Sequence, residues 1–154
     1  METAIIYYSK HHQNTKKLVD AIARQEDVTL FPASTAAALD LSNFDLIGFA
    51  SGIYYQKFHK NILTCAQKNL PPNKDVFLLY TYGAKRDAYT HAIQQIVAAK
   101  GGRILGSYGC LGFDTFGPLS LIGGIAKERP NEEDIAKAVQ FFQSLRNDYA
   151  KSSR

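Results

Sequence analysis

Apolar and polar positions along the chain form two kinds of segment. Short runs that are apolar throughout are typical of strands covered on both faces of a sheet. Longer segments with apolar residues at helical spacing are typical of amphipathic helices. The pattern predicts five strands, at residues 4–8, 28–31, 44–50, 76–80 and 103–110. It predicts helices at 14–24, 58–68 and 86–100, and a last helix after Asn131.

The order of these segments indicates the fold class. Strands that alternate with helices imply a parallel sheet with right-handed crossovers and helices on both faces. We therefore predict an α/β, three-layer sandwich around a five-stranded parallel sheet. A chain of 154 residues is long enough to bury a core, and we expect one domain at residues 1–150. Residues 151–154 are expected to form a frayed end.

Composition and charge restrict the class of protein. The net charge of +4 is mildly basic, and no basic stripe is interleaved with aromatic residues, which disfavours nucleic-acid binding. No apolar run reaches the length of about 18 residues that a membrane span needs. Without a secretory leader pattern, and with Cys65 and Cys110 outside a C-x-x-C pair, we expect a reducing, cytoplasmic location. Both thiols are predicted to pack in the interior.

The first loop carries the strongest chemical signal. Residues 10–15 form a polar stretch between the first strand and the first helix, and Ser9 and Thr15 flank it with hydroxyls. The first N–H groups of a helix have no internal acceptor, and the helix dipole adds partial positive charge there. This arrangement predicts a site for a phosphate group. Neighbouring His11 and His12 lack a carboxylate or thiol at ligand spacing, so no metal site is predicted.

The other strand ends complete the predicted site. Ligands of open parallel sheets bind outside the carboxyl ends of the strands, and the segments there are 51–55, 81–85 and 110–114. Two of them place tyrosines beside a glycine, which suits a flat ring with a phosphate tail. Tyr54, Tyr55 and Tyr82 remain open between ring stacking and simple packing. Residues 113–129 lack periodicity and are predicted to be a long loop, often a functional feature.

Four segments together resemble the flavodoxin family. Residues 9–15 read Ser-Lys-His-His-Gln-Asn-Thr and resemble the S-x-H-H-G-N-T phosphate loop of one branch of that family. The same branch is resembled by three further segments: residues 52–54 with 57–60, residues 112–118 with 121–124, and residues 129–132. The likeness covers essentially the whole chain. It implies a flavodoxin-like sandwich with sheet order 2-1-3-4-5, FMN as cofactor, and electron transfer as activity.

The resemblance also implies which residues hold the cofactor. Those on the phosphate are Ser9, His11, His12, Gln13, Asn14 and Thr15. Those around the ring and the rest of the cofactor are Ser51, Gly52, Ile53, Tyr54, Thr81, Tyr82, Gly83, Lys85, Gly112, Phe113 and Asp114. Gln13 stands where the motif has glycine, which costs energy if the backbone needs a positive φ. The chain lacks the acidity of classical flavodoxins, so their docking on basic partners does not carry over.

Three functions are possible for a chain with this sequence pattern. The first is an electron carrier that meets redox partner flavoenzymes transiently, with its oligomeric state left open. The second is an FMN-dependent oxidoreductase of quinone or protoporphyrinogen-oxidase type, because residues 52–59 faintly resemble the latter. The third, a cofactor-free receiver module, needs acidic residues where the chain has Ser9, Lys10 and Ser51. The electron carrier is preferred.

Overall fold

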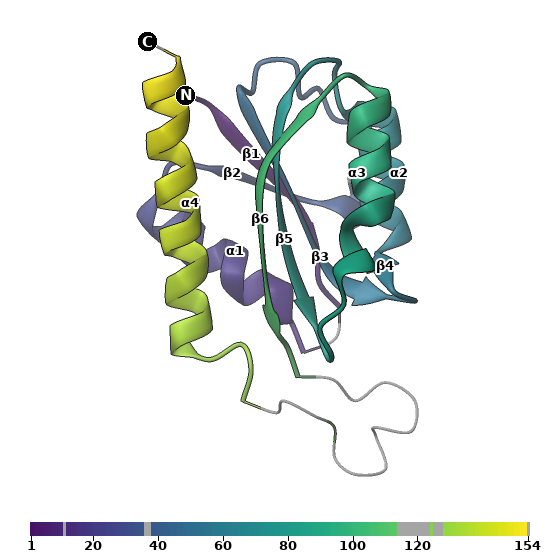
Figure 1. The fold of residues 1–154 in the computed structure, drawn as a ribbon, viewed down its shortest axis with the longest axis vertical. Helices are drawn as coiled ribbons and strands as arrows, with labels where there is room; N and C mark the ends of the chain where they lie inside the picture. The colour runs from purple at the N-terminus through teal and green to yellow at the C-terminus, as the bar shows by residue number, and fades with distance from the viewer. Residues whose placement is uncertain (11, 36–37, 114–123, 125–127, 154) are drawn as a thin grey trace.

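The computed structural model describes residues 1–154 apart from 11, 36–37, 114–123, 125–127 and 154. Its layers are those of an α/β sandwich, with a central sheet between two pairs of helices (Figure 1). In chain order the elements are β1 (Thr3–Tyr8), α1 (Asn14–Gln25), β2 (Thr29–Pro32), the 3-10 helix η1 (Ala33–Thr35), β3 (Leu46–Tyr54), β4 (Lys57–Phe58), α2 (Lys60–Asn69), β5 (Asp75–Tyr82), the 3-10 helix η2 (Asp87–Thr90), α3 (His91–Ala99), β6 (Arg103–Leu111) and α4 (Glu132–Ser152).

Five parallel strands lie in the order β2-β1-β3-β5-β6, which confirms the predicted order 2-1-3-4-5. Chain order reverses beside β1, where β2 lies on one side and β3 on the other. The carboxyl ends of β1, β3, β5 and β6 therefore share one edge of the sheet, the lower edge in Figure 1. Within the described ranges, none of the helices combines the length and apolar character needed to cross a bilayer.

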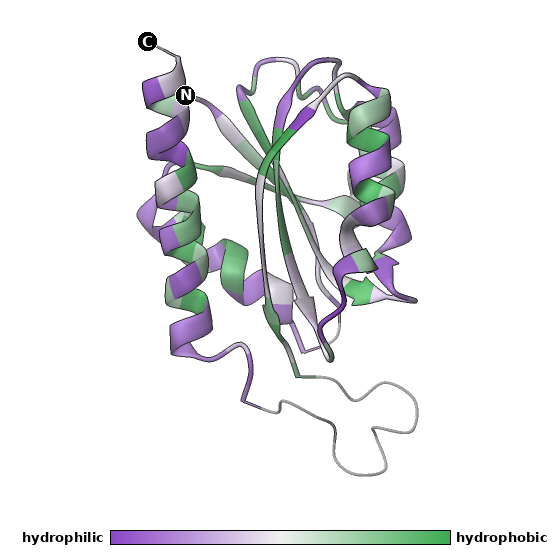
Figure 2. Cartoon of the chain, in the orientation of Figure 1, coloured by the Kyte–Doolittle hydropathy of each residue, from purple (hydrophilic) through white to green (hydrophobic). Residues whose placement is uncertain are grey.

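Burial of both sheet faces produces two cores. Successive side chains of a strand point to opposite faces, so Ala4 and Ile6 enter the core beneath α2 and α3, whereas Ile5 enters the core beneath α1 and α4. The strands are largely hydrophobic, and the helices mix hydrophobic and hydrophilic positions (Figure 2). Cys65 packs in the first core, as predicted. Cys110 is also buried, and burial is the main reason that its pKa rises to about 12.

Local residues mark the end of α3 and the start of α4. Gly101 follows α3 with φ of 70°, where a residue without Cβ adopts the left-handed conformation at no steric cost. Asn131 caps α4, and its side chain accepts a hydrogen bond from the Asp134 N–H while the Asp134 carboxylate accepts one from the Asn131 N–H. The helix continues to Ser152, two residues into the segment 151–154.

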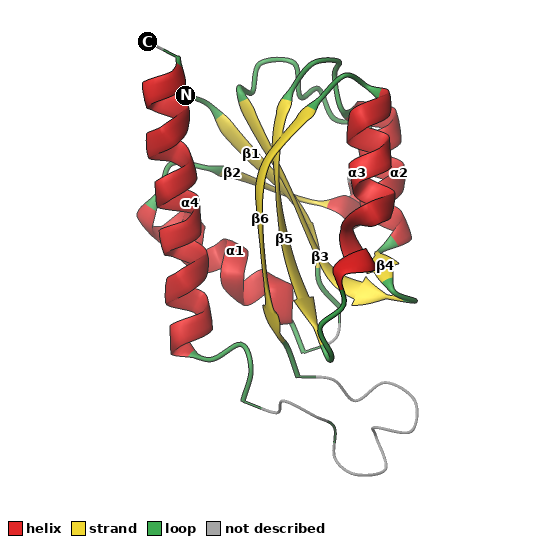
Figure 3. Cartoon of the chain, in the orientation of Figure 1, coloured by secondary structure: helices red, strands yellow, loops and turns green. Residues whose placement is uncertain are grey.

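The predicted strand 44–50 is wrong at both ends, because β3 begins at Leu46 and continues to Tyr54. Its last residues pair with β4 in an antiparallel hairpin that was not predicted (Figure 3). The two residues of the turn, Tyr55 and Gln56, have φ of 51° and 64°. Hairpin turns with two positive φ values normally contain Asn-Gly or Asp-Gly. The sequence signal for a hairpin was therefore absent.

The hairpin also shortens the predicted helix 58–68. Residues 57 and 58 belong to β4, and α2 starts at Lys60 with His59 as its N-cap. The predicted helix 86–100 is divided in the structure. Its first turn is η2, and the α-helical part covers His91–Ala99. A 3-10 turn is common at the N-terminus of an α-helix.

The capping of α4 allows a direct test. Replacement Asn131→Ala removes the acceptor for the Asp134 N–H, and we expect it to lower the free energy of unfolding by about 1 kcal/mol. Asn131→Ser, which keeps a capping oxygen, is the matched control and should lose much less. Urea denaturation of the three proteins measures the difference. Equal midpoints for the alanine variant and the parent would contradict the assigned role of this cap.

Candidate functional site

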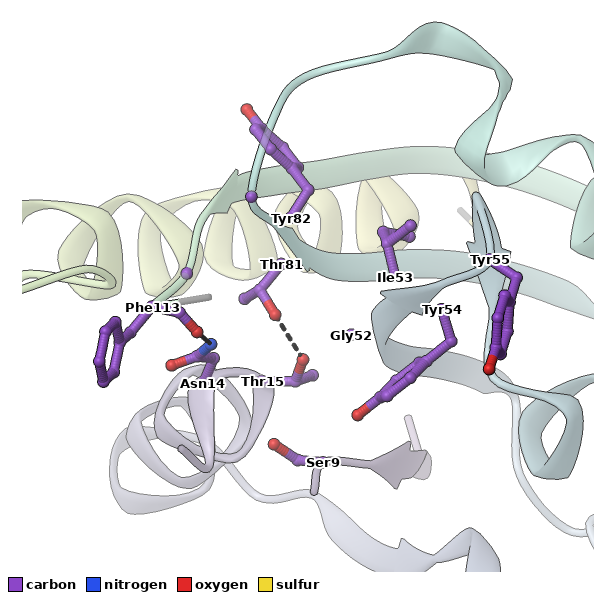
Figure 4. Close-up of a pocket in the computed structure, with 12 residues that line it drawn as sticks. Ser9, Asn14, Thr15, Gly52, Ile53, Tyr54, Tyr55, Thr81, Tyr82 and Phe113 are labelled. Carbon is purple, nitrogen blue, oxygen red and sulfur yellow. Dashed lines mark hydrogen bonds between the residues drawn. The ribbon is translucent and has the colours of Figure 1, made fainter. Parts of the chain in front are cut away.

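A cavity opens at the carboxyl edge of the sheet, where the ends of β1, β3, β5 and β6 meet the start of α1 (Figure 4). With its open mouth it comprises about 620 Å³ of space free of atoms. The residues that line it are Ser9, Asn14, Thr15, Gly52, Ile53, Tyr54, Tyr55, Thr81, Tyr82, Gly83, Gly112 and Phe113.

The chain enters α1 through two residues in the left-handed region. His12 and Gln13 have φ of 54° and 55°, so position 13 does require the positive φ for which the motif normally has glycine. The Ser9 hydroxyl accepts a hydrogen bond from the Lys16 N–H at 3.2 Å. Among the described residues, the N–H groups of Asn14 and Thr15 have no acceptor. These two donors are available to an anion at the helix N-terminus.

The floor of the cavity is closed by side chains from distant segments. Thr15 and Thr81, both nearly inaccessible to solvent, share a hydrogen bond of 2.9 Å between their hydroxyls. The Asn14 Nδ2 donates to the Phe113 carbonyl at 2.8 Å. A Cβ at Gly112 would lie 2.6 Å from that nitrogen, so this strand end packs directly on Asn14. The contacts hold the start of α1 against the ends of β5 and β6.

One buried polar atom in the cavity wall lacks a partner within the described part of the chain. It is the Asn14 Oδ1, on a residue with only 8% of its surface exposed. A buried acceptor without a donor costs free energy. A ligand with a hydroxyl or N–H group at this point would remove that cost. Asn14 therefore presents an acceptor beside the two free helix donors.

Tyrosines form the opposite wall, on β3 and β5 (Figure 4). The ring of Tyr54 packs edge-on against Tyr8, with centroids 5.8 Å apart, and against His59 at 4.8 Å. Its hydroxyl accepts a hydrogen bond from the Lys10 N–H at 3.4 Å. Tyr55 at the hairpin tip is 85% exposed and still contributes to the lining. Tyr8 and His59 thus support the ring of Tyr54, while Tyr55 is open to solvent.

His59 supports this wall from the start of α2. Its ring stacks on Tyr8 with centroids 3.7 Å apart and planes 8° apart. Its Nδ1 accepts a hydrogen bond from the Asn61 N–H at 3.1 Å, which requires that nitrogen to be unprotonated. Partial burial, with smaller contributions from Lys60 and Lys10, lowers the pKa of His59 below its ordinary value of 6.5. The ring is therefore neutral at pH 7.

The last strand end is joined to α4. The Phe113 N–H donates to the Arg129 carbonyl at 2.8 Å, and the Arg129 guanidinium forms a two-pronged ion pair with Asp134. Burial by itself would raise the pKa of Asp134, but hydrogen bonds from Arg129 and Asn131 outweigh it and hold the pKa below its ordinary value. Asp134 thus stabilises the start of α4 and also holds Arg129, whose carbonyl binds the Phe113 N–H at the edge of the cavity.

The structure brings most of the predicted site residues together. Every lining residue except Tyr55 belongs to the predicted set, although their contact with a cofactor stays a prediction. His12 lies beside the lining, with its ring 4.0 Å from that of Phe113. Gln13 and Lys85 are exposed, and neither contributes to the lining. His11 and Asp114 lie outside the described residues.

Ser51 belongs to the predicted set but is not among the lining residues. It is fully buried and does not line the cavity. Its hydroxyl donates to the Gly52 carbonyl at 2.6 Å and accepts from the His59 N–H at 2.9 Å. Ser51 therefore orients the backbone of the cavity wall and fixes the start of α2. Residue spacing gave no sign of this, because the hairpin that folds His59 back onto Ser51 was not predicted.

Two contributions to the site were missed or undervalued. For Tyr55 the sequence does not distinguish ring stacking from simple packing, and the structure makes it part of the lining. His59 falls within the predicted helix 58–68 and outside the predicted site, whereas its ring packs against both Tyr8 and Tyr54. The only available signal was the similarity of residues 57–60 to the flavodoxin branch.

Comparison with known proteins agrees with this architecture. The sheet order and the position of the cavity place the chain among doubly wound α/β proteins, which bind ligands where strand order reverses. Residues 4–111 match the model of the flavodoxin domain, and the chain belongs to this family. An uncharacterised protein of Methanocaldococcus jannaschii is 36% identical over 147 residues, which cover 94% of this chain and 98% of that protein.

Solved structures share the fold at low sequence identity. Rubredoxin oxygen:oxidoreductase of the anaerobe Desulfovibrio gigas has a TM-score of 0.71 and 14% identity, and the match covers all of this chain and 38% of that one. A flavoprotein of Lactobacillus acidophilus in complex with FMN has a TM-score of 0.54 and 19% identity, and the match covers 71% and 92% of the two chains. At these identities the likeness shows the fold.

The left-handed backbone at Gln13 yields a prediction. A side chain in this conformation costs about 1 kcal/mol, and Gln13 is exposed, so its side chain contributes little packing. We expect Gln13→Gly to raise the free energy of unfolding by up to about 1 kcal/mol. Gln13→Ala retains a Cβ and should leave it near the parent value. Thermal and urea denaturation would contradict the assignment if glycine and alanine variants were equally stable.

The lowered pKa of His59 predicts a pH dependence. The unfolded chain takes up a proton near pH 6.5, which the native ring resists. The contribution to stability is therefore complete above about pH 6.5 and is lost as the pH falls through the lower native pKa. His59→Asn retains an N-cap acceptor and removes this titration. The difference in unfolding free energy between parent and variant should shrink from pH 7.5 to pH 5, and a constant difference would contradict the prediction.

Proposed function

We propose that the chain binds FMN in this cavity and carries electrons between redox enzymes of the cytoplasm, with other flavoenzymes as transient partners. The observation that carries the proposal is the pairing of two unlike surfaces in one cavity. Free N–H groups and a buried, unpartnered Asn14 Oδ1 lie at the start of α1, and tyrosines lie opposite. A phosphate on a polar chain fits the first surface, and a flat ring system fits the second.

Each residue has a defined task in this proposal. The N–H groups of Asn14 and Thr15 donate to the phosphate, with the Ser9 hydroxyl close by. Tyr54 and Tyr82 cover the ring, and Tyr55 shields its outer edge. Flavin, when bound, supplies the transfer of one or two electrons. The protein orients the cofactor and restricts the access of water to it.

Backbone groups are also part of the proposed site. Gly52 lies on the wall, and a Cβ there would approach the Tyr54 ring to 3.1 Å. The Ser51 hydroxyl holds the Gly52 carbonyl in one orientation. Such a fixed carbonyl presents a defined acceptor at the ring edge. The family membership and the likeness to an FMN complex support flavin as the ligand.

Binding measurements test the phosphate contact. Thr15→Val removes the hydroxyl that bonds Thr81 and holds the start of α1, with its N–H groups, at the cavity, and we expect FMN affinity to fall by about tenfold, equivalent to about 1.4 kcal/mol. Riboflavin, which lacks the phosphate, should bind both proteins equally weakly. Thr15→Ser keeps the hydroxyl and is the matched control. Calorimetry or quenching of flavin fluorescence provides the affinities, with urea denaturation to confirm folding.

Two results would overturn parts of the proposal. Equal affinity of the parent protein for FMN and riboflavin would contradict the proposed phosphate site. An absence of flavin binding would contradict the proposed function as a whole. Steady turnover of a reduced nicotinamide and a quinone by the FMN-loaded chain, with no added reductase, would favour the alternative, an FMN-dependent oxidoreductase. Reduction that needs an added reductase would support the electron carrier.

A further inference from the structure

Cations gather on one flank of the cavity mouth. Lys10 follows Ser9 of the lining, Lys57 pairs with Tyr54 across the hairpin, and Lys60 is the first residue of α2. Lys85 and Arg86 follow Gly83 in the loop after β5. All five side chains are exposed. We call these five residues the basic flank.

The basic flank is not neutralised by neighbouring carboxylates in the described part of the chain. None of its members belongs to an ion pair with a described residue, whereas five other cations of the protein do. Asp87 is the one described carboxylate within the same loops, and it is exposed. The flank therefore presents several uncompensated positive charges around the aromatic side of the cavity.

Negative charge lies on the other flank. Glu132 and Glu133 are exposed in the first turn of α4, and Glu128 is exposed shortly before it in the chain. This end of α4 lies toward the lower edge of the sheet in Figure 1. Glu133 pairs with Lys137, which reduces its effect. Among the described residues, the mouth of the cavity is thus electrically asymmetric, positive beside the hairpin and α2 and more negative beside α4. Such an asymmetry orients a charged partner before contact.

We infer that the basic flank is a docking surface for a redox protein with an acidic electron-transfer face. The inference rests on the proposed function, since it needs a flavin in the cavity. The exposed Tyr55 at the hairpin tip places an aromatic contact beside the cations. Aromatic residues are enriched in protein interfaces, whereas a charged rim mainly sets the rate of association. This combination favours a protein over a nucleic acid or a membrane surface.

The basic flank should attract an acidic partner and repel a basic one. The attraction should be strong at low ionic strength and should weaken with salt, because the Debye length falls from about 30 Å at 0.01 M to about 3 Å at 1 M. A partner with a basic face should behave in the opposite way. The sign of the salt dependence therefore reports the charge of the surface that surrounds the cavity.

The probe is a reduced plant-type [2Fe–2S] ferredoxin of low reduction potential, chosen for a strongly negative net charge. Each transfer oxidises one ferredoxin cluster and adds one electron to the FMN-loaded chain, and stopped-flow absorbance follows it. We expect the second-order rate to fall at least tenfold from about 10 mM to about 500 mM salt. Oxidised cytochrome c, a basic acceptor, provides the comparison. Its reduction by the reduced FMN-loaded chain should become faster as salt is added.

A matched pair of variants localises the effect. The flank variant combines Lys57→Gln, Lys60→Gln and Arg86→Gln, and the control combines Arg24→Gln, Lys68→Gln and Lys151→Gln near the far ends of α1, α2 and α4. Both remove three exposed cations, so both leave a net charge of +1 from the original +4. We expect the flank variant to lose most of the rate at low salt and the control to retain it, with FMN affinity unchanged in both.

A flavin-independent measurement separates the two proposals. Retention of the apo and FMN-loaded chains on immobilised ferredoxin at low salt tests the surface even if flavin binding fails. Retention of the parent and the control, with loss in the flank variant, supports the inference. Equal behaviour of the two variants, a ferredoxin rate that rises with salt, or retention on heparin or phosphatidylserine vesicles without retention on ferredoxin would overturn it.

Discussion

Burial of both faces of one parallel sheet is the constraint on which the rest of the structure depends. The central strands are apolar on both sides, so helices must cover both faces. Each parallel connection then returns across a face, and the loops that follow the strands collect at one edge. The start of α1 and the ends of β3, β5 and β6 meet there as a consequence. The cavity is the space that these strand ends leave between them.

Backbone conformation builds the two sides of the site. His12 and Gln13 turn the chain into α1 through the left-handed region, and the N–H groups of Asn14 and Thr15, two lining residues, have no acceptor among the described residues. Tyr55 and Gln56 use the same region to close the hairpin that carries Tyr54. Both pairs lack glycine, so both hold strain. Strain of this kind persists where surrounding contacts over-determine the backbone, and it concentrates at binding sites.

Side chains that do not line the cavity hold these segments in place. His59 packs behind Tyr8 and Tyr54, and the Ser51 hydroxyl joins the cavity strand to the start of α2. On the opposite side Asp134 caps α4 and pairs with Arg129, whose carbonyl accepts from the Phe113 N–H. The two sets of contacts brace the aromatic wall and the last strand end separately. A ligand would therefore meet a largely preformed site.

The amino-acid sequence by itself determined the five parallel strands, their order through the family resemblance, and the local signals at Gly101 and Asn131. These features depend on the period of apolar residues and on caps, which are local properties. Tertiary structure alone decided the contacts of Asn14 with Phe113 and of Thr15 with Thr81, which join residues 99 and 66 positions apart. It also decided the hairpin, whose Tyr-Gln turn lacks the usual residues, and hence the burial of Ser51 and the stacking of His59. Pairings of this kind arise only when distant segments pack together, and no local pattern encodes them.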